Sequence, residues 1–404
     1  MEQIRKLEEV LREREMEEQQ PYAYWLNSVS GVGNVTAKQL IEALGSPKMV
    51  YHAGEKRLRE VVSPKVAEEL IRAQNKDVLA AYRELGRKGI TMVPFYHPKY
   101  PARLIHIADS PFCLYIKGRL PLDERPSLAI VGARNCSEYG RYVAEHFAKN
   151  FAELGIQIVS GMAKGIDGVA GDAAMKAGGD TYAVLGCGVD ICYPSSNVEL
   201  YEEICKTGGV ISEYLPGTTP SPGLFPARNR IISALADAVL VVEARQKSGT
   251  LITVDMALEQ GREVYVVPGR ITDRLSDGCN RLLIQGANPA LSAEQMFAEL
   301  SETIWKGYKK NVEDVQKDKT KGAAGQQTDS VTGCRLQKLG DKQRALYTLL
   351  DFYPISMEQI WLMVQTKEEL QGTTLPQIME MLLELCVTGL AKNEGGYYSC
   401  KEPV

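Results

Sequence analysis

Three kinds of feature are scarce in this 404-residue chain, and each scarcity excludes a class of protein. No apolar run approaches the roughly 18 to 20 residues that cross a bilayer, so we expect no membrane partner. The first 20 residues lack the apolar core of a signal peptide, which favours a cytoplasmic location. Nine cysteines at irregular spacing form no paired CxxC motifs, so we expect free thiols rather than a zinc site.

An overall positive charge is missing as well. The chain has 47 Lys and Arg residues against 51 Asp and Glu residues, which gives a formal net charge of −4. A nucleic-acid site in this chain therefore requires a local concentration of Lys and Arg in specific loops.

The N-terminal part of the chain reads as helical. Residues 1–20 are highly charged and place Ile4, Leu7 and Leu11 on one narrow helical stripe. Residues 21–89 include "SGVGNVTAKQLIEALGS", a Gly-Val-Gly turn followed by an amphipathic helix that stops at Gly45. This pattern predicts a helix-hairpin-helix or SAM-like module, which either binds a phosphate through the free amides of its turn or serves only for packing.

The middle of the chain, residues 90–305, has the pattern of an α/β domain. A lead-in segment over 90–126 is broken by prolines. From residue 127 onward, apolar runs alternate with stretches long enough to hold a helix; the runs are LAIVGA, IQIVSG, TYAVLG, GVISEY, AVLVVEA and EVYVVPG. Strands buried on both faces need such runs, so we predict an extended Rossmann-like, doubly wound and mostly parallel sheet.

Two further segments follow this domain. Residues 306–340 are polar, rich in Lys and nearly free of large apolar residues, so we predict a flexible linker. Residues 341–404 offer three helical stretches and a terminal hairpin with a Gly-Gly turn, which predicts a winged-helix-like domain. Such domains bind DNA or proteins, and the pattern alone does not decide between them.

The chemistry is expected in the loops that follow the strands, because open α/β sheets bind ligands at the carboxyl ends of their strands. These loops concentrate the positive charge that the whole chain lacks; they carry Arg134, Lys164, Arg245, Lys247 and Arg270. The first loop, "GARNCSEYG", begins at Gly132 but has no GxGxxG pattern, so we expect no dinucleotide and no other cofactor.

Three of these loops have the composition of phosphate sites. The loop "SGMAKGID", from Gly161 through Lys164, places small residues before a helix. Arg134 followed by Ser137 at an expected helix start combines a guanidinium, a hydroxyl and free amides, although a surface ion pair beside a helix cap gives the same pattern. The turn formed by Ser248, Gly249 and Thr250 before another helix has small residues that let a phosphate or carboxylate approach.

The stretch "LFPARNRIISALADAVLVVEA" at residues 224–244 adds a second basic element. If Pro226 begins a helix, Arg228, Asn229 and Arg230 fall in its first turn, where positive charge opposes the helix dipole. This placement is favourable if a phosphate occupies that end, so we predict half of a phosphate clamp. Phe225 is the candidate for stacking on a base, with a loop anchor as the alternative.

An enzyme is less well supported by the residues. The stretch "RQKSGTLITVDMALEQG" lacks the PGGxGTxxE pattern of nucleotide hydrolases on a related fold, and no Ser-His-Asp arrangement is present. We interpret the strand-end acids as groups that orient Arg and amide donors rather than as catalysts; they are Asp167, Asp190, Glu213 and Glu243.

Together and in order, "AIVGARNCSEYG", "SGMAKGIDGVAGDAA", "AVLGCGVDICYPSSN", "GGVISEYLPGTTP", "FPARNRIIS", "VVEARQKSGTLIT", "VYVVPG" and "SDGCNRLLIQGA" resemble the DNA-processing protein A family (DprA, also called Smf). The resemblance implies a homodimeric protein without enzymatic activity that binds and protects single-stranded DNA and loads the RecA recombinase during natural transformation.

Transferred position by position, the resemblance implies DNA contacts in four places; they are Arg134 with Ser137, Gly161 with the loop through Lys164, Arg228 to Arg230, and Lys247 with the Ser248 to Thr250 turn. One departure is Gly171, which stands where the family commonly has a histidine.

Two rival functions remain at this stage. One is a nucleotide-processing enzyme of the phosphoribohydrolase type that uses Glu243 or Asp255. The other is a ligand-sensing regulator that binds duplex DNA through the winged-helix-like domain.

Overall fold

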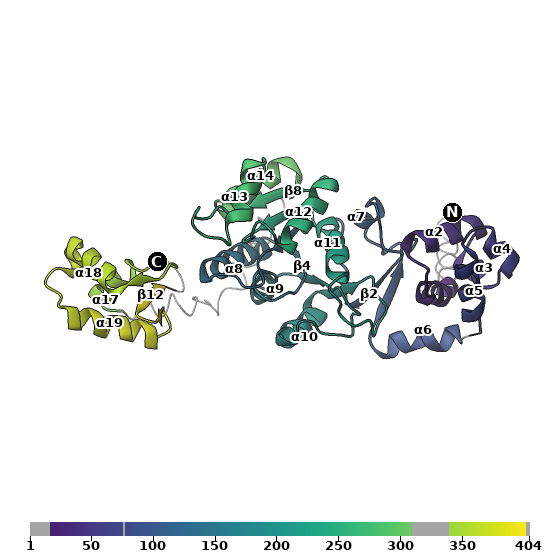
Figure 1. Ribbon diagram of the computed structural model, residues 1–404, viewed down its shortest axis with the longest axis horizontal. Helices are drawn as coiled ribbons and strands as arrows, with labels where there is room; N and C mark the ends of the chain where they lie inside the picture. Colours follow the sequence, from purple (N-terminus) through teal and green to yellow (C-terminus); the bar gives the residue numbers. More distant parts are fainter. Residues whose placement is uncertain (1–16, 76, 307, 309–338, 401–404) are drawn as a thin grey trace, which may run out of the picture. The chain divides into compact units, whose positions relative to one another are not determined.

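The computed structural model describes residues 17–75, 77–306, 308 and 339–400 (Figure 1). It contains two compact units: the first comprises residues up to 135 and from 144 to 308, and the second comprises residues 136–143 and those from 309 onward. Most of the charged segment predicted over residues 1–20 and of the linker predicted over 306–340 lies outside the described residues.

The first unit begins with short helices that share one apolar core. After a helix over residues 17–28 come α2 (Asn34–Leu44), α3 (Pro47–Tyr51), α4 (Glu55–Arg59), α5 (Pro64–Ala73) and α6 (Val78–Arg87). Trp25, Leu40 and Leu70 are buried between them. Gly45 ends α2 with a φ of 103°, as the sequence predicts.

The sheet of the first unit has three strands beyond the six apolar runs of the sequence. Its strands are β1 (Thr91–Pro94), β2 (Cys113–Gly118), β3 (Ser127–Val131), β4 (Gln157–Ser160), β5 (Thr181–Val184), β6 (Gly209–Ser212), β7 (Ala238–Val241), β8 (Glu263–Val266) and β9 (Asn288–Pro289). They lie in the order β1-β2-β6-β5-β4-β3-β7-β8-β9. Along this order, all neighbouring pairs from β6 through β5, β4, β3, β7 and β8 to β9 are parallel. The pairs β1–β2 and β2–β6 are antiparallel.

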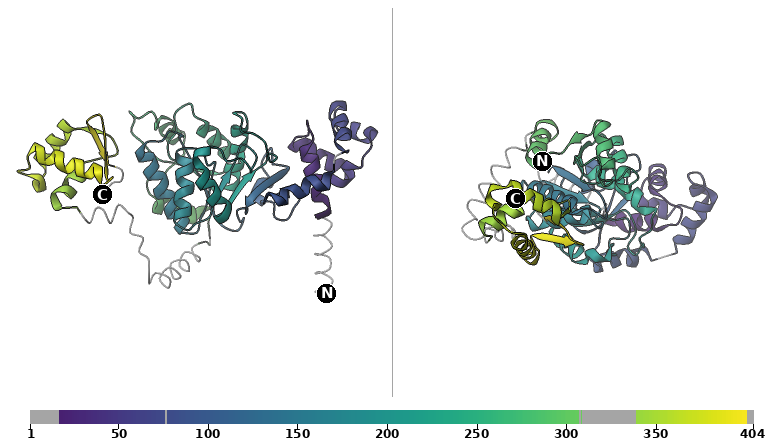
Figure 2. Two further views of the ribbon diagram at one scale, coloured as in Figure 1. Left: turned by 90° about the horizontal axis from the view of Figure 1, so that it is seen from below. Right: turned by 60° about the vertical axis from the view of Figure 1, so that its left-hand side comes forward.

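The predicted parallel sheet is therefore confirmed, and each of the six apolar runs contains a strand. The antiparallel edge formed by β1 and β2 comes from the segment predicted only as a lead-in. This edge packs against the N-terminal helices, because Phe112, Cys113 and Tyr115 belong to the same apolar core as Trp25 and Leu40 (Figures 1 and 2).

The helices of the α/β domain are α7 (Ala102–Ile105), α8 (Glu138–Glu153), α9 (Ile166–Lys176), α10 (Val198–Thr207), α11 (Leu224–Leu235), α12 (Gly249–Glu259), α13 (Asp277–Ile284) and α14 (Ala293–Thr303). One core joins Ala129 and Val131 of β3 to Ile231 of α11 and Val254 of α12. Helices α11 and α12 thus pack on one face of the sheet.

The strand order creates a gap at the carboxyl ends of β3 and β7. The chain leaves β3 toward β4 on one side, whereas β7 leads to β8 on the other side. The loops after the two strands therefore diverge, and such a topological switch point is where open α/β sheets bind ligands.

The C-terminal unit has its own core and sheet. It comprises α17 (Asp341–Tyr347), β10 (Ile355–Ser356), α18 (Met357–Thr366), α19 (Leu375–Val387), β11 (Ala391–Glu394) and β12 (Tyr397–Cys400), with the strands in the order β10-β12-β11. Leu346, Ile360, Ile378 and Leu382 are fully buried in its centre.

Gly165, at the N-cap of α9, provides a test of the loop packing beside the switch point. Its φ is 76°, and an added Cβ would lie 2.2 Å from the Ala133 carbonyl oxygen. Gly178 has the same φ but nothing within 4 Å of an added Cβ. We expect Gly178→Ala to cost only the left-handed strain of about 1–2 kcal/mol, and Gly165→Ala to cost about 1–3 kcal/mol more because the loops must move apart.

Urea unfolding followed by tryptophan fluorescence measures both values. Equal losses of stability in the two variants would contradict the close contact between the loops after β3 and β4.

Candidate functional site

Two cavities that share several lining residues lie at the carboxyl edge of the sheet. Their volumes are about 210 and 490 Å³, and both are lined by Arg134, Ala163, Tyr193, Phe225 and Arg228. We call their union the switch-point cavity. Of the thirteen candidate residues from the sequence, the structure brings ten together here; they are Gly132, Arg134, Gly161, Lys164, Phe225, Arg228, Asn229, Ser248, Gly249 and Thr250.

Three candidates do not line the cavity. The Ser137 hydroxyl accepts a hydrogen bond from the backbone N–H of Gly140 at 3.0 Å, the geometry of a helix start. Lys247 is exposed. Arg230 lies on α11 with its guanidinium engaged elsewhere, as described below.

Two exposed cations stand at the rim of the cavity. Arg134 follows β3, and Lys164 follows β4 in the loop before α9; both side chains are exposed. The guanidinium of Arg134 lies 5.5 Å from the centre of the Phe225 ring, a distance at which a cation and an aromatic face attract.

Phe225 is half-buried and forms a pair with a residue that the sequence interpretation missed. Its ring stacks on Tyr193 with a centroid distance of 5.4 Å and an interplanar angle of 25°. Tyr193 lies in the loop after β5 and is 40% exposed. An aromatic residue in a strand-end loop was the available signal for it. Gly186 makes room for this pair, since a Cβ there would lie 2.8 Å from the Phe225 ring.

Arg228 forms part of the wall of the cavity and is almost fully buried, with 5% exposure. Its guanidinium donates hydrogen bonds to the carbonyl oxygens of Gly161, at 3.0 Å, and Val184. Arg228 thereby joins the ends of β4 and β5. Gly161 must be glycine here, because an added Cβ would lie 2.7 Å from the Arg228 guanidinium and from the Asp167 carboxylate.

Asp167 supplies the negative charge that faces Arg228. Its carboxylate accepts a hydrogen bond from the Gly161 backbone N–H at 3.1 Å. Burial lowers the pKa of Arg228, and the charge of Asp167 opposes that shift. Burial likewise raises the pKa of Asp167 against the opposing charge of Arg228. Each charge therefore offsets part of the cost of burying the other.

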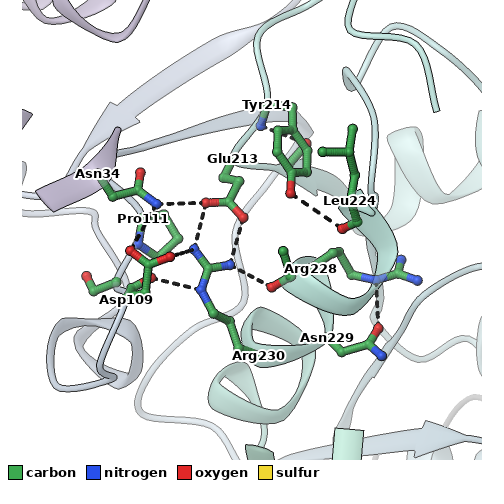
Figure 3. A network of polar contacts seen from close by, with 12 residues as sticks. Asn34, Asp109, Pro111, Glu213, Tyr214, Leu224, Arg228, Asn229 and Arg230 are labelled. Carbon is green, nitrogen blue, oxygen red and sulfur yellow. Dashed lines mark hydrogen bonds and ion pairs between the residues drawn. The ribbon is translucent and has the colours of Figure 1, made fainter. Parts of the chain in front are cut away.

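Arg230 points away from the cavity into a separate polar network (Figure 3). Its two terminal nitrogens donate to the two carboxylate oxygens of Glu213, each at 2.7 Å, and its Nε donates to the Asp109 carbonyl oxygen at 2.8 Å. Burial lowers the pKa of Arg230, but its hydrogen bonds to Glu213 together with the negative charges of Glu213 and Asp109 outweigh this and raise the pKa. Asn34 of α2 donates to Glu213 at 3.0 Å, so the network ties α11 to the N-terminal helices.

The predicted start of α11 is wrong. The helix begins at Leu224, which places Pro226 third and puts Arg228 and Arg230 in the second turn. Pro226 is tolerated there because the first N–H groups of a helix have no partner within it. The argument that both arginines oppose the helix dipole in the first turn therefore does not hold.

The N-terminus of α12 faces the switch-point cavity. Ser248 is the N-cap, yet its hydroxyl makes no capping bond, and its buried oxygen lacks a hydrogen-bond partner in the described part of the chain. The Thr250 hydroxyl donates to the Gly132 carbonyl at 3.2 Å, which joins the loops after β3 and β7. An uncapped helix N-terminus with positive partial charge is suited to an anion.

The acidic candidates are engaged or lie elsewhere. Asp190 accepts a hydrogen bond from the Gly217 N–H at 2.7 Å, and Glu213 binds Arg230. Glu243 is buried and Asp255 is exposed, and neither lines the cavity. Gly171 faces Thr181 and Leu200 inside the fold, so the missing histidine does not alter the cavity wall.

The described ranges lack two kinds of feature. In residues 17–75, 77–306, 308 and 339–400, no three His, Cys, Asp or Glu side chains are grouped as metal ligands would be. Across the same residues, no helix is long and apolar enough to traverse a membrane.

Comparisons with known proteins agree with the fold and the motifs. Residues 91–301 match the family described as DNA recombination-mediator protein A, and residues 26–76 match a SAM-like helix-hairpin-helix tandem. The chain is 44% identical over 226 residues to the DNA processing protein DprA of Bacillus subtilis (strain 168), an alignment covering 56% of this chain and 75% of that protein.

A second relative and a solved structure extend the match. The protein Smf of Synechocystis is 37% identical over 287 residues, covering 69% of this chain and 72% of that protein. The X-ray structure of DNA processing protein A from Streptococcus pneumoniae superposes with a TM-score of 0.62 at 35% identity, covering 69% of this chain and 97% of that chain.

The Arg228–Asp167 pair yields a stability prediction. Arg228→Met leaves the Asp167 carboxylate buried without its counter-charge, so we expect a loss of about 3–5 kcal/mol. Adding Asp167→Asn removes the stranded charge and should recover part of this loss. Urea unfolding of the two variants and the parent measures the difference; a double variant that is no more stable than Arg228→Met would contradict the pairing.

Proposed function

This chain belongs to the DNA recombination-mediator protein A family, and from that membership we propose that it binds single-stranded DNA along the carboxyl edge of its parallel sheet. The observation that carries the proposal is the switch-point cavity, which combines exposed cations, a stacked aromatic pair and an uncapped helix N-terminus. Proteins hold single strands with these elements: positive charge along the phosphates and aromatic rings under the bases.

The phosphates are assigned to the rim. Arg134 and Lys164 are exposed and free to turn toward a phosphate, and the N-terminus of α12 offers amides from Gly249 onward. The unpartnered Ser248 hydroxyl adds a donor at the same place. Arg134 is the strongest of these groups, because a guanidinium donates two parallel hydrogen bonds to a phosphate.

The bases are assigned to the aromatic pair. Tyr193 is exposed and already stacked on Phe225, so a base can extend the stack at little cost in ordering. Stacking accepts every base, which is suitable for a protein that covers strands of any sequence. Arg228 has a different role in this proposal, since its buried guanidinium holds the loops and adds positive potential beneath the strand.

The finer functions rest on the family resemblance. We propose that the protein acts in the cytoplasm as a homodimer without enzymatic activity, protects incoming strands during natural transformation and loads the RecA recombinase onto them. We also propose that the C-terminal unit is a winged helix, since its element order and three-stranded sheet are those of that fold.

The phosphate contact is tested by Arg134→Ala. We expect weaker binding to oligo-dT, and the slope of log affinity against log salt should fall by about 0.7, the value for one lost phosphate contact on a single strand. Fluorescence anisotropy at several salt concentrations measures both quantities.

The matched control is Lys176→Ala. Lys176 ends α9 at the opposite edge of the sheet, so neither affinity nor slope should change. An Arg134→Ala variant with the parent's salt slope would contradict the assignment of Arg134 to a phosphate.

The base contact is tested by Phe225→Leu, which retains an apolar side chain against Gly186 but removes the ring. Stacking on a base contributes about 1–3 kcal/mol, so we expect affinity for oligo-dT to fall by about 5- to 150-fold. The salt slope should stay as in the parent because no charge is lost. Parental affinity in a correctly folded Phe225→Leu protein would exclude stacking at this ring.

A further inference from the structure

Helix α19 of the C-terminal unit, which is labelled in Figure 1, carries an exposed apolar stripe. Leu375, Met379, Leu383 and Val387 follow one another at intervals of four residues and are 42%, 52%, 65% and 81% exposed. Side chains at this spacing lie along one side of a helix. We call these four residues the α19 stripe. A continuous exposed apolar surface of this kind marks an interaction site more often than four scattered residues do.

The stripe is separate from the face that holds the unit together. The core side of α19 is formed by Ile378, Leu382 and Leu385, which are fully buried. Folding of the unit therefore does not require the stripe. At its N-terminal end the stripe borders a groove of about 380 Å³, lined by Trp361 and Val364 of α18 and by Leu375 itself.

The charges of the C-terminal unit are mostly negative. Residues 339–400 contain eight Asp and Glu residues and four Lys and Arg residues. Helix α19 has Glu380 and Glu384, both exposed, and no Lys or Arg. In the hairpin of β11 and β12, Lys392 is paired with Glu394 at 2.6 Å.

These charges argue against DNA as the ligand of α19. A helix–turn–helix unit places its second helix in the major groove, and winged helices add contacts from the hairpin. In this chain the corresponding helix is α19, which carries two glutamates and the apolar stripe. In the hairpin, the charge of Lys392 is neutralised by Glu394. Proteins gain DNA affinity from unpaired Lys and Arg near the phosphates. The same negative charge disfavours pairing with a second copy, because Glu380 and Glu384 would face their own counterparts.

We propose that the α19 stripe and the adjoining groove dock a helical segment of a partner protein whose apolar face is bordered by Lys and Arg. The apolar side chains of such a segment would cover the α19 stripe, and its cations would face Glu380 and Glu384. This is the helix-in-groove mode, in which spaced apolar anchors give affinity and flanking charges give selectivity. The proposal concerns the C-terminal unit and does not depend on the function assigned to the switch-point cavity.

The test uses the full chain and two synthetic 16-residue helical peptides labelled with fluorescein. Both peptides carry leucines at three- and four-residue spacing; one has Lys beside the leucines and the other has Glu. We expect the Lys peptide to bind at least tenfold more tightly than the Glu peptide in an anisotropy titration. The double variant Met379→Ser/Leu383→Ser should lose at least tenfold in affinity for the Lys peptide.

Leu362→Ser is the matched control, since Leu362 is 62% exposed on α18 but lies outside the stripe and the groove lining. It should bind the Lys peptide as the parent does. Both variants should bind oligo-dT normally, so failure of the docking proposal and failure of the single-strand proposal give different results.

The proposal would be overturned by no binding of either peptide, equal binding of both peptides, unchanged Lys-peptide affinity in the double variant, or duplex DNA binding that the double variant abolishes. A change from dimer to monomer in the double variant, seen by sedimentation, would also overturn it, since it would identify a second copy as the occupant.

Discussion

The site depends on the interactions that stabilise the buried charge of Arg228. A guanidinium at 5% exposure is stable only if nearby groups compensate its lost hydration. Asp167 supplies the opposite charge, and the carbonyl oxygens of Gly161 and Val184 accept hydrogen bonds from the Arg228 guanidinium. Those carbonyls lie at the ends of the neighbouring strands β4 and β5. The contacts that stabilise the charge therefore also fix the loop after β4, which carries Lys164, and the start of the loop after β5, which carries Tyr193. The cavity is therefore shaped by a buried charge and the polar groups that compensate it rather than by apolar packing alone.

Helix α11 transmits this constraint in two directions. Phe225 and Arg228 lie on the side that faces the cavity, whereas Arg230 faces Glu213 and, through it, Asn34 of α2. Lys38, one turn further along α2, donates to the Ser110 carbonyl at 2.6 Å. The N-terminal helices and the switch-point cavity are thus attached to opposite sides of one helix. A change at the Asn34–Glu213 contact is expected to alter the cavity through the position of α11.

The sequence predicted the parallel sheet and the cavity loops because both depend on local pattern. Buried parallel strands require continuous apolar runs, and the carboxyl ends of such strands meet at one edge. The antiparallel β1 and β2 were missed because prolines break their segment and their pairing is long-range. Arg228 and Arg230 were assigned one role because they lie close together in the sequence, but residues two apart on a helix differ by about 200° in direction. Tyr193 was missed because its stacking on Phe225 joins the loop after β5 to the start of α11, and these segments are distant along the chain.

The central claim is that single strands lie over the aromatic pair of the switch-point cavity. The most direct measurement is photo-cross-linking of an oligonucleotide that carries 5-iodouracil, followed by mass spectrometry of the linked peptides. We predict that the label attaches to Tyr193 or Phe225 and that unlabelled oligo-dT competes it away. Cross-links confined to the N-terminal helices or to the C-terminal unit, with none in the loops after β4 and β5 or at the start of α11, would contradict the account.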